Sequence, residues 1–141
     1  MDHVNVGVKF RWVPLGRVSL DDAGRLVFPK APVAPGLYRF DLEKDGRPTT
    51  YVGESDLLAR RLQHYRTPGP TQRTNLRLND LFRTLLAQGT SISVSIVTDD
   101  IQVSLGSTTH SANLNRKQDR VLLEHAALLA AYAGGHSILN A

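Results

Sequence analysis

The stretch from residue 36 to residue 65 constrains the fold of this chain most, because it predicts a β-hairpin followed directly by a helix. Its two strands flank Asp45-Gly46, a dipeptide that strongly favours a tight hairpin turn. Ser55 or Asp56 is placed to cap a helix that begins at Leu57. The stretch is also rich in tyrosine, glycine and arginine, which packing alone does not explain.

The rest of the chain adds strands and two further helices to this unit. Residues 1–35 are predicted to be a β-rich N-terminal extension that adds strands to the main sheet or covers one of its edges. Residues 91–97 form the clearest strand, because polar and apolar residues alternate. The later helices are expected from about 74 to 87 and from about 116 to 133. This order predicts an α+β or layered α/β fold around a small sheet.

Two segments near the end carry specific expectations. Residues 98–115 are polar and rich in Ser, Thr and Asn, so they are expected to be a mobile loop with a short strand near Val103. The last helix is apolar on nearly every face, which predicts a central rather than a peripheral position.

Composition bears on compartment and on the kinds of site that are possible. The chain has no cysteine, which excludes disulfides and thiolate metal sites. No apolar run approaches the roughly 18 residues of a membrane span. The first residues lack the basic start and apolar core of a signal peptide. We therefore expect a soluble, cytoplasmic protein with no membrane partner.

Positive charge is concentrated on the first two expected helices. The formal net charge is +4, and six arginines with no lysine fall within 24 residues. They are Arg60, Arg61, Arg66, Arg73, Arg77 and Arg83. The planar guanidinium suits bidentate contact with phosphate, so we favour an anionic partner over a merely solvated helix face.

Two charged residues fall where helices are expected to bury their side chains. On a wheel of about 100° per residue, Arg61 lies within the apolar arc of the first helix, whereas Arg60 lies outside it. Glu124 lies among apolar residues of the last helix, where a carboxylate needs a partner. Taken by itself, Arg61 has another explanation, in which its aliphatic part lies along the core and its guanidinium reaches the surface. Together the two residues predict either a structural salt bridge, which the residues alone favour, or a site that binds a divalent cation and an anionic substrate.

Two tyrosines of the hairpin favour the second interpretation. Tyr38 and Tyr51 occupy facing strands and can point to the same side of the sheet. A phenol ionises near pH 10, but a nearby metal or arginine favours the phenolate. Gly36 and Gly53 leave open backbone that suits the approach of a phosphate. The commoner alternative is a pair of tyrosines packed on the core with satisfied hydroxyls.

In order along the chain, these residues resemble the signature of the GIY-YIG nuclease family. Gly36-Leu37-Tyr38 has its tyrosine thirteen positions before Tyr51-Val52-Gly53, and Arg61 follows eight residues after that glycine. The resemblance covers about residues 36–141. This stretch is similar to the N-terminal catalytic module of UvrC-type repair nucleases. It implies a small central antiparallel sheet of three core strands, which N-terminal strands can extend, flanked by three helices. Leu37 replaces the usual isoleucine, and Glu54 stands where UvrC-type members often carry lysine.

The resemblance also implies a divalent-metal-dependent endonuclease acting on DNA. Glu124 matches the glutamate that binds Mg²⁺ or Mn²⁺, and Arg61 matches the arginine that stabilises charge on the phosphate. Tyr51 or Tyr38, as phenolate, activates the attacking water. The remaining site residues are His64 and Tyr65, which orient water or phosphate, and Asn140, which braces the site.

Partners follow from the same resemblance and from the charge pattern. Arg60, Arg66, Arg73 and Arg77 are expected to bind nucleic acid, and a homodimer or a partner protein is expected to direct the target choice. The alternative function is a non-catalytic nucleic-acid-binding module that retains the fold. A third candidate is a structural interaction domain with an incidental Arg61–Glu124 ion pair.

Overall fold

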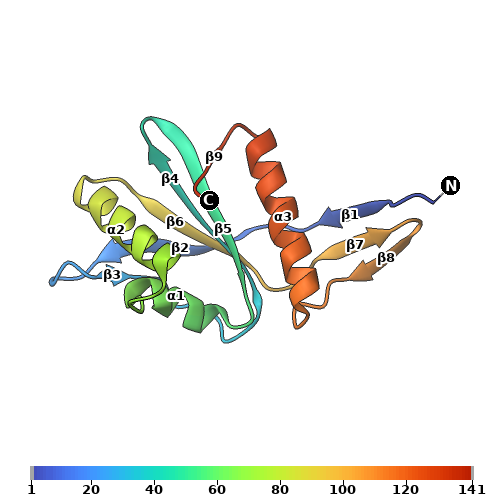
Figure 1. Cartoon of the computed structure of the whole chain (residues 1–141), viewed down its shortest axis with the longest axis horizontal. Helices are drawn as coiled ribbons and strands as arrows, with labels where there is room; N and C mark the ends of the chain where they lie inside the picture. The colour runs from blue at the N-terminus through green and yellow to red at the C-terminus, as the bar shows by residue number, and fades with distance from the viewer. Residues whose placement is uncertain (1, 141) are drawn as a thin grey trace.

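The computed structural model describes residues 2–140. Its centre is a six-stranded sheet in the order β3-β2-β6-β4-β5-β9 (Figure 1). The strands are β2 (Val13–Leu20), β3 (Leu26–Val27), β4 (Gly36–Lys44), β5 (Arg47–Ser55), β6 (Ile92–Val97) and β9 (Ser137–Ile138). Neighbours are antiparallel except for β5 and β9, which run parallel. The expected core of three antiparallel strands, extended by N-terminal strands, is confirmed in β6-β4-β5 with β2 and β3.

The hairpin turn between β4 and β5 forms as the sequence predicts. Asp45 and Gly46 both have positive φ, at 56° and 73°. A type I′ turn requires positive φ at both central residues, and its twist matches that of the flanking strands. The turn therefore fixes a register in which Tyr38 lies opposite Gly53.

Three helices flank the sheet, which confirms the α+β class. They are α1 (Leu58–Arg66), α2 (Arg73–Ala87) and α3 (Lys117–Ala133). The apolar sides of α1 and α2 pack on one face of the sheet, while α3 lies along β5 (Figure 1). No helix within residues 2–140 has the length and hydropathy needed to cross a bilayer.

The start of α1 differs from the prediction. The helix begins at Leu58, and Leu57 occupies the cap position without a side-chain hydrogen bond to the helix. The Ser55 hydroxyl accepts instead from the Leu57 amide at 3.0 Å, and Asp56 pairs with Arg60 at 2.8 Å. Neither expected residue therefore caps the helix.

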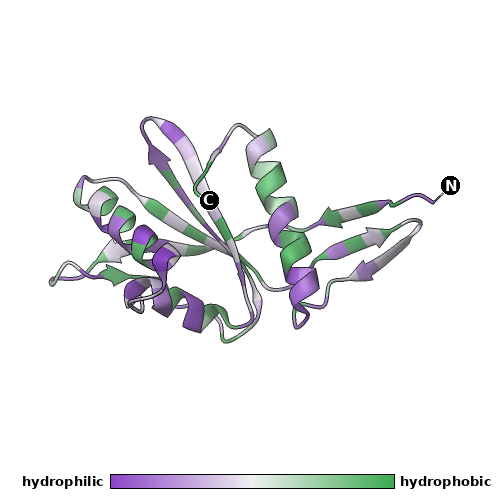
Figure 2. Cartoon of the chain, viewed as in Figure 1, coloured by the Kyte–Doolittle hydropathy of each residue, from purple (hydrophilic) through white to green (hydrophobic). Residues whose placement is uncertain are grey.

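The prediction that α3 is central is wrong. Its buried residues are Arg120, Leu123 and Ala127, whereas Leu129 and Tyr132 are 70% and 71% exposed. Figure 2 shows hydrophobic bands along α3 even though much of the helix faces solvent. Much of that apolar character comes from alanines, which lose little when they are exposed. The helix therefore covers one flank of the sheet only.

The prediction for residues 98–115 is right about a short strand near Val103, which is β7, but wrong about a mobile loop. The segment contains a hairpin of β7 (Gln102–Leu105) and β8 (Thr108–Ser111). β1 (Val6–Lys9) pairs antiparallel with β7, so a second, three-stranded sheet projects beside α3 (Figure 1). β7 alternates polar and apolar residues over four positions only, and β8 is exposed along its whole length and has no apolar residue, so the sequence pattern that marks a hairpin is weak here.

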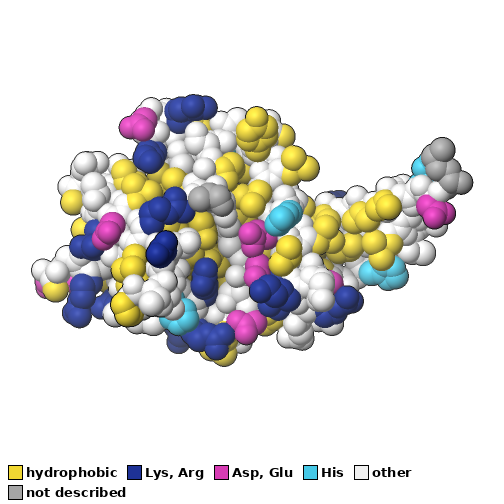
Figure 3. All heavy atoms as spheres, viewed as in Figure 1, with side chains coloured by type: hydrophobic (Ala, Val, Ile, Leu, Met, Phe, Trp, Pro, Cys, Tyr) yellow, Lys and Arg dark blue, Asp and Glu magenta, His cyan; other side chains and the backbone are white. Residues whose placement is uncertain are grey.

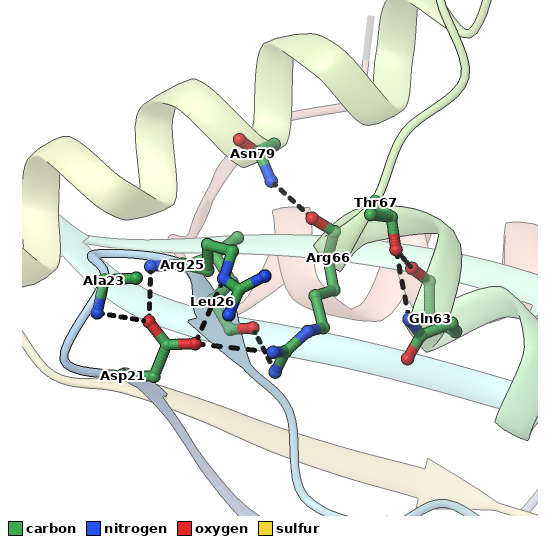
Figure 4. Close-up of polar contacts among 8 residues, drawn as sticks. All are labelled: Asp21, Ala23, Arg25, Leu26, Gln63, Arg66, Thr67 and Asn79. Atoms are coloured by element: carbon green, nitrogen blue, oxygen red, sulfur yellow. Dashed lines mark hydrogen bonds and ion pairs between the residues drawn. The ribbon is translucent and has the colours of Figure 1, made fainter.

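The end of α1 is anchored to the turn between β2 and β3 (Figure 4). Arg66 donates from Nη1 to the Leu26 carbonyl at 3.1 Å and from Nη2 to Asp21 at 3.3 Å. Asn79 of α2 donates to the Tyr65 carbonyl at 2.7 Å. These contacts join α1 to the sheet and α2 to α1, and they fix the position of α1 against the hairpin.

Candidate active site

Three tyrosines lie together where the hairpin faces α1. Tyr38 and Tyr51 point to the same side of the sheet, as predicted, with ring centroids 6.3 Å apart. Tyr65, in the last turn of α1, lies 5.9 Å from the Tyr38 ring and 6.4 Å from the Tyr51 ring. The Tyr38 and Tyr65 hydroxyls share a hydrogen bond of 2.6 Å, and both residues are fully buried.

The glycines of the two motifs serve this packing. A Cβ at Gly53 would overlap the ring of Tyr38, and a Cβ at Gly36 would overlap the carbonyl of Val97. The expectation that these glycines leave open backbone for a phosphate is therefore wrong, because protein atoms fill the space. Glycine is needed at position 53 so that the Tyr38 ring can lie against β5.

Arg61 reaches the tyrosines from α1. Its Nε donates to the Tyr38 hydroxyl at 3.0 Å, and its Cζ lies 5.4 Å from the Tyr65 ring centroid. Arg60 is exposed and pairs with Asp56 instead. The wheel argument is thus confirmed, since only the second of these adjacent arginines points toward the buried side.

Burial controls the protonation of the buried phenols. It raises the pKa of Tyr38 and of Tyr65, because the phenolate would lose its hydration. The nearby Arg61 does favour the Tyr38 phenolate, as expected, but burial outweighs it. Burial alone would lower the pKa of Arg61, yet the Tyr38 and Tyr65 oxygens outweigh that effect and raise it. At neutral pH the arrangement is therefore two neutral phenols and a charged guanidinium.

Tyr51 differs from the other two tyrosines in its hydrogen bonding. It is 7% exposed, and its hydroxyl has no hydrogen-bond partner within residues 2–140. The Tyr38 hydroxyl, by contrast, is already engaged by Tyr65 and Arg61. Tyr51 is therefore the member of the trio whose hydroxyl is free to meet a ligand.

A cleft of about 370 Å³ opens beside the arginine, between α1, the end of β5 and the start of α3. It is lined by Glu54, Ser55, Asp56, Arg60, Arg61, His64, Lys117 and Arg120. On this face, basic side chains gather over α1 and α2, and some of the acidic side chains lie between those helices and α3 (Figure 3). The half-buried His64 lines the same cleft as Arg61, so the structure brings these two predicted residues together.

Two carboxylates lie close to this cleft. Glu124 is half-buried and forms no ion pair within residues 2–140. The pKa of Glu124 is raised mainly by burial and to a lesser extent by the charge of Glu54, while the charges of His125 and Arg61 act to lower it. Glu54 is itself held by the buried Arg120, whose Nε lies 2.6 Å from its Oε2. The alternative of a structural Arg61–Glu124 salt bridge is therefore wrong for the described residues, and the ion pair formed here is Arg120–Glu54.

Glu124 fits a hard divalent cation. Its carboxylate is partly desolvated and close enough to Glu54 to feel that charge, a situation that a cation relieves. No group of three or more His, Asp or Glu side chains converges within residues 2–140. A cation here would therefore take most of its ligands from water and substrate, as Mg²⁺ commonly does.

This arrangement of sheet and helices matches a solved structure. A mutant of bacteriophage T4 EndoII aligns over 82% of this chain and 86% of its own, with a TM-score of 0.55 and 16% sequence identity. The chain has the fold of EndoII. EndoII is a GIY-YIG family nuclease, so the fold implied by the sequence resemblance is confirmed. No protein-family model and no curated protein matches the sequence.

Asn140 closes the EndoII-like fold at its C-terminal end. Its side chain accepts from the Val52 amide at 3.1 Å and donates to the Val52 carbonyl at 2.7 Å. The Leu139 amide donates to the Thr50 carbonyl at 2.8 Å, which continues the pairing of β9 with β5. Asn140 therefore contacts the backbone next to Tyr51, while its role in bracing the site stays a prediction.

The structure gives different surroundings to the four arginines that we expect to bind nucleic acid. Arg60 pairs with Asp56, and Arg66 is engaged at the β2–β3 turn. Arg77 donates to the Leu139 carbonyl at 3.2 Å, and Arg73 is exposed in the first turn of α2. Their binding to nucleic acid stays a prediction.

Arg120 is a site residue that the sequence reasoning missed. It is 6% exposed, donates to the Leu114 carbonyl at 2.9 Å and precedes Glu124 by four residues. Residues four apart lie on nearly the same helix face. The wheel argument that singled out Glu124 therefore also applies to Arg120, and a second buried charge of opposite sign was the available signal.

Proposed function

We propose that this chain is an endonuclease that hydrolyses phosphodiester bonds in DNA with a divalent cation, Mg²⁺ or Mn²⁺. The observation that carries the proposal is the state of Arg61. Its Nε is fixed by the Tyr38 hydroxyl at the wall of the cleft, and no carboxylate pairs with it within residues 2–140. A preorganised guanidinium without a counter-ion is suited to stabilise charge that develops on a phosphate. The likeness to EndoII in fold supports the same reaction class.

The three tyrosines have different roles in this proposal. Tyr38 and Tyr65, as neutral phenols, hold the guanidinium of Arg61 in one orientation. Tyr51 is the better candidate for general base, because its hydroxyl is not engaged by the protein within residues 2–140. As phenolate it takes the proton of the attacking water. His64, on the cleft wall, orients that water or the phosphate.

Glu124 is the residue that would hold the cation. A bound cation supplies charge stabilisation at the scissile phosphate and the leaving oxygen. The Arg120–Glu54 pair lies beside it and keeps the second carboxylate neutralised and turned toward α3. We assign the choice of the DNA target to a homodimer or to a partner protein, and we place the protein in the cytoplasm.

The test is a cleavage and binding assay with single-stranded, double-stranded and plasmid DNA, in Mg²⁺, Mn²⁺ or EDTA. Wild-type protein should cut in the presence of either cation, and Glu124→Gln and Arg61→Ala should each remove cutting. Binding without cutting by the wild type would instead establish the non-catalytic nucleic-acid-binding module. Cutting that survives both substitutions would place the activity elsewhere.

A further inference from the structure

A second cleft adjoins the candidate active site at the start of α2. Its volume is about 250 Å³, and it is lined by Arg61, Gln72, Arg73, Thr74 and Asn75. Arg61 also lines the first cleft. A ligand that follows the surface from one cleft to the other therefore passes the same guanidinium.

The first turn of α2 presents free backbone donors to this cleft. Gln72 occupies the cap position but makes no capping bond, because its Oε1 accepts from the Gly69 amide at 2.9 Å and from Asn75 Nδ2 at 3.0 Å. The amide of Leu76 bonds to the Gln72 carbonyl. The amides of Thr74 and Asn75 have no acceptor within residues 2–140. Free amides at a helix N-terminus bind anions, and the helix dipole adds to the effect.

The charges around this helix end are those of an anion site. The first turn of α2 contains no acidic residue and begins with the exposed Arg73. A cation at the positive end of a helix is unfavourable unless an anion lies beside it. Arg61 brings a second positive charge to the same cleft.

Asn75 provides an independent sign of a missing ligand. It is 3% exposed and lines the cleft, and its Oδ1 has no hydrogen-bond partner. Its Nδ2 is committed to Gln72, and this fixes the amide so that the unused atom is the acceptor. A buried carbonyl oxygen without a donor is destabilising. A water that hydrates a bound phosphate has a second hydrogen to donate to it.

We propose that the start of α2 is a subsite for a phosphate that flanks the scissile phosphate in the nucleic-acid strand. This inference rests on the proposed nuclease function. The phosphate oxygens accept from the Thr74 and Asn75 amides, and Arg73 supplies charge. Asn75 Oδ1 accepts from a phosphate-bound water, and Arg61 marks the boundary with the reacting position.

The first test adds a carboxylate at the subsite with Thr74→Glu, in a Glu124→Gln background that prevents cutting. An acidic residue in the first turn favours the helix but repels phosphate, so thermal stability should hold or rise while duplex DNA binding weakens about tenfold. Gln88→Glu makes the same charge change at the exposed C-terminal end of α2 and should bind as its parent does. Affinity is measured by fluorescence anisotropy.

A second variant and a substrate change keep the test independent of folding. Arg73→Gln should lower the slope of log K against log salt by about 1, as expected for one lost phosphate contact. The substrate change uses the active protein and replaces one phosphate of the DNA at a time with a neutral methylphosphonate. At one position that flanks the cut, this replacement should impair cutting by the wild type. In Thr74→Glu, the same replacement should make no further difference to cutting.

The outcomes separate this subsite from the proposed function. Equal affinities for Thr74→Glu and Gln88→Glu, or an unchanged salt slope for Arg73→Gln, would overturn the subsite while the wild type still cuts DNA. A wild type that neither binds nor cuts DNA would overturn the proposed function itself.

Discussion

Gly53 lies opposite Tyr38 in the β4–β5 ladder, and the Tyr38 ring occupies the space that a Cβ would need. Gly53→Ala should therefore displace the ring and the Arg61 hydrogen bond that depends on it. We expect a loss of about 1–3 kcal/mol in the free energy of unfolding, as for other overpacked sites, together with loss of cleavage. Urea denaturation and plasmid cleavage measure the two effects. Gly7→Ala, where a Cβ would make only an ordinary contact with Ser104, should match the wild type in both.

The assignment of the general base predicts different defects for two tyrosines. Tyr51→Phe should lower the single-turnover rate about 10²–10⁴-fold and leave stability unchanged. Tyr38→Phe should instead cost about 1–3 kcal/mol of stability, because it leaves the buried Tyr65 hydroxyl and Arg61 Nε without their partner. A Tyr51→Phe protein with the wild-type rate would remove Tyr51 from the role of base.

Glu124 links pH, cation and stability. Burial and Glu54 raise its pKa, so the ionised form is disfavoured in the folded protein. The contribution of this group to stability is therefore present at low pH, when it is protonated, and is lost as pH rises through the raised pKa. A cation needs the ionised form, so cleavage should fall on the acid side at a pH above the ordinary glutamate value of 4.5.

Glu124→Gln tests this linkage in both directions. At pH 7.5 in EDTA the variant should melt at a higher temperature than the wild type, because it lacks the disfavoured charge. Added Mg²⁺ should raise the melting temperature of the wild type alone, and cleavage by the variant should fall about 10³-fold. A variant that melts below the wild type in EDTA would contradict the assignment.

At the scale of elements, the ion pair between the buried Arg120 and the partly buried Glu54 joins α3 to β5. Arg120→Met should lower the free energy of unfolding by less than the roughly 3–5 kcal/mol of a fully buried pair, because it leaves the partly buried Glu54 without a counter-charge. Adding Glu54→Gln to that variant should recover much of the loss, since no unpaired charge then remains. Denaturant unfolding of both single variants and the double variant measures the coupling, and additive losses would show that the two side chains act separately.

The elements also show what sequence reasoning can and cannot reach. The β4–β5 hairpin, α1 and α2 are specified by local signals such as Asp45-Gly46 and helical periodicity, so they were predicted within about two residues. The β7–β8 hairpin depends on pairing with β1, almost a hundred residues earlier, which no local pattern reveals. The alanines of α3 appear apolar in sequence but are too small to require burial, so its peripheral position was missed.

The candidate site shows the same division. The helical wheel identified Arg61 correctly, because the direction of a side chain on a helix follows from its spacing. The pairing of Arg120 with Glu54, and the lack of an Arg61–Glu124 ion pair within residues 2–140, were not predicted, because a salt bridge depends on distances between elements. The roles of Gly36 and Gly53 were inverted for a similar reason, since sequence shows a missing side chain but not what fills its space.

At the scale of the whole molecule, the site is built from residues that lie far apart in the sequence. Tyr38, Tyr51 and Arg61 come from the hairpin and α1, while Glu124 comes from α3. Residues 2–140 contain one such constellation, so under the proposed function one chain supplies one cut. Two antiparallel strands of a duplex present opposite polarities, and a two-fold homodimer is the simplest assembly that meets both.

A monomer should therefore nick a supercoiled plasmid, so that open circles accumulate before linear product. As protein concentration rises through the dissociation constant of a dimer, linear product should appear without a lag, because paired sites cut both strands in one encounter. A gel time course over a range of protein concentrations measures this, with sedimentation velocity at the same concentrations. Direct linearisation at concentrations where only monomer sediments would contradict the one-chain, one-cut prediction.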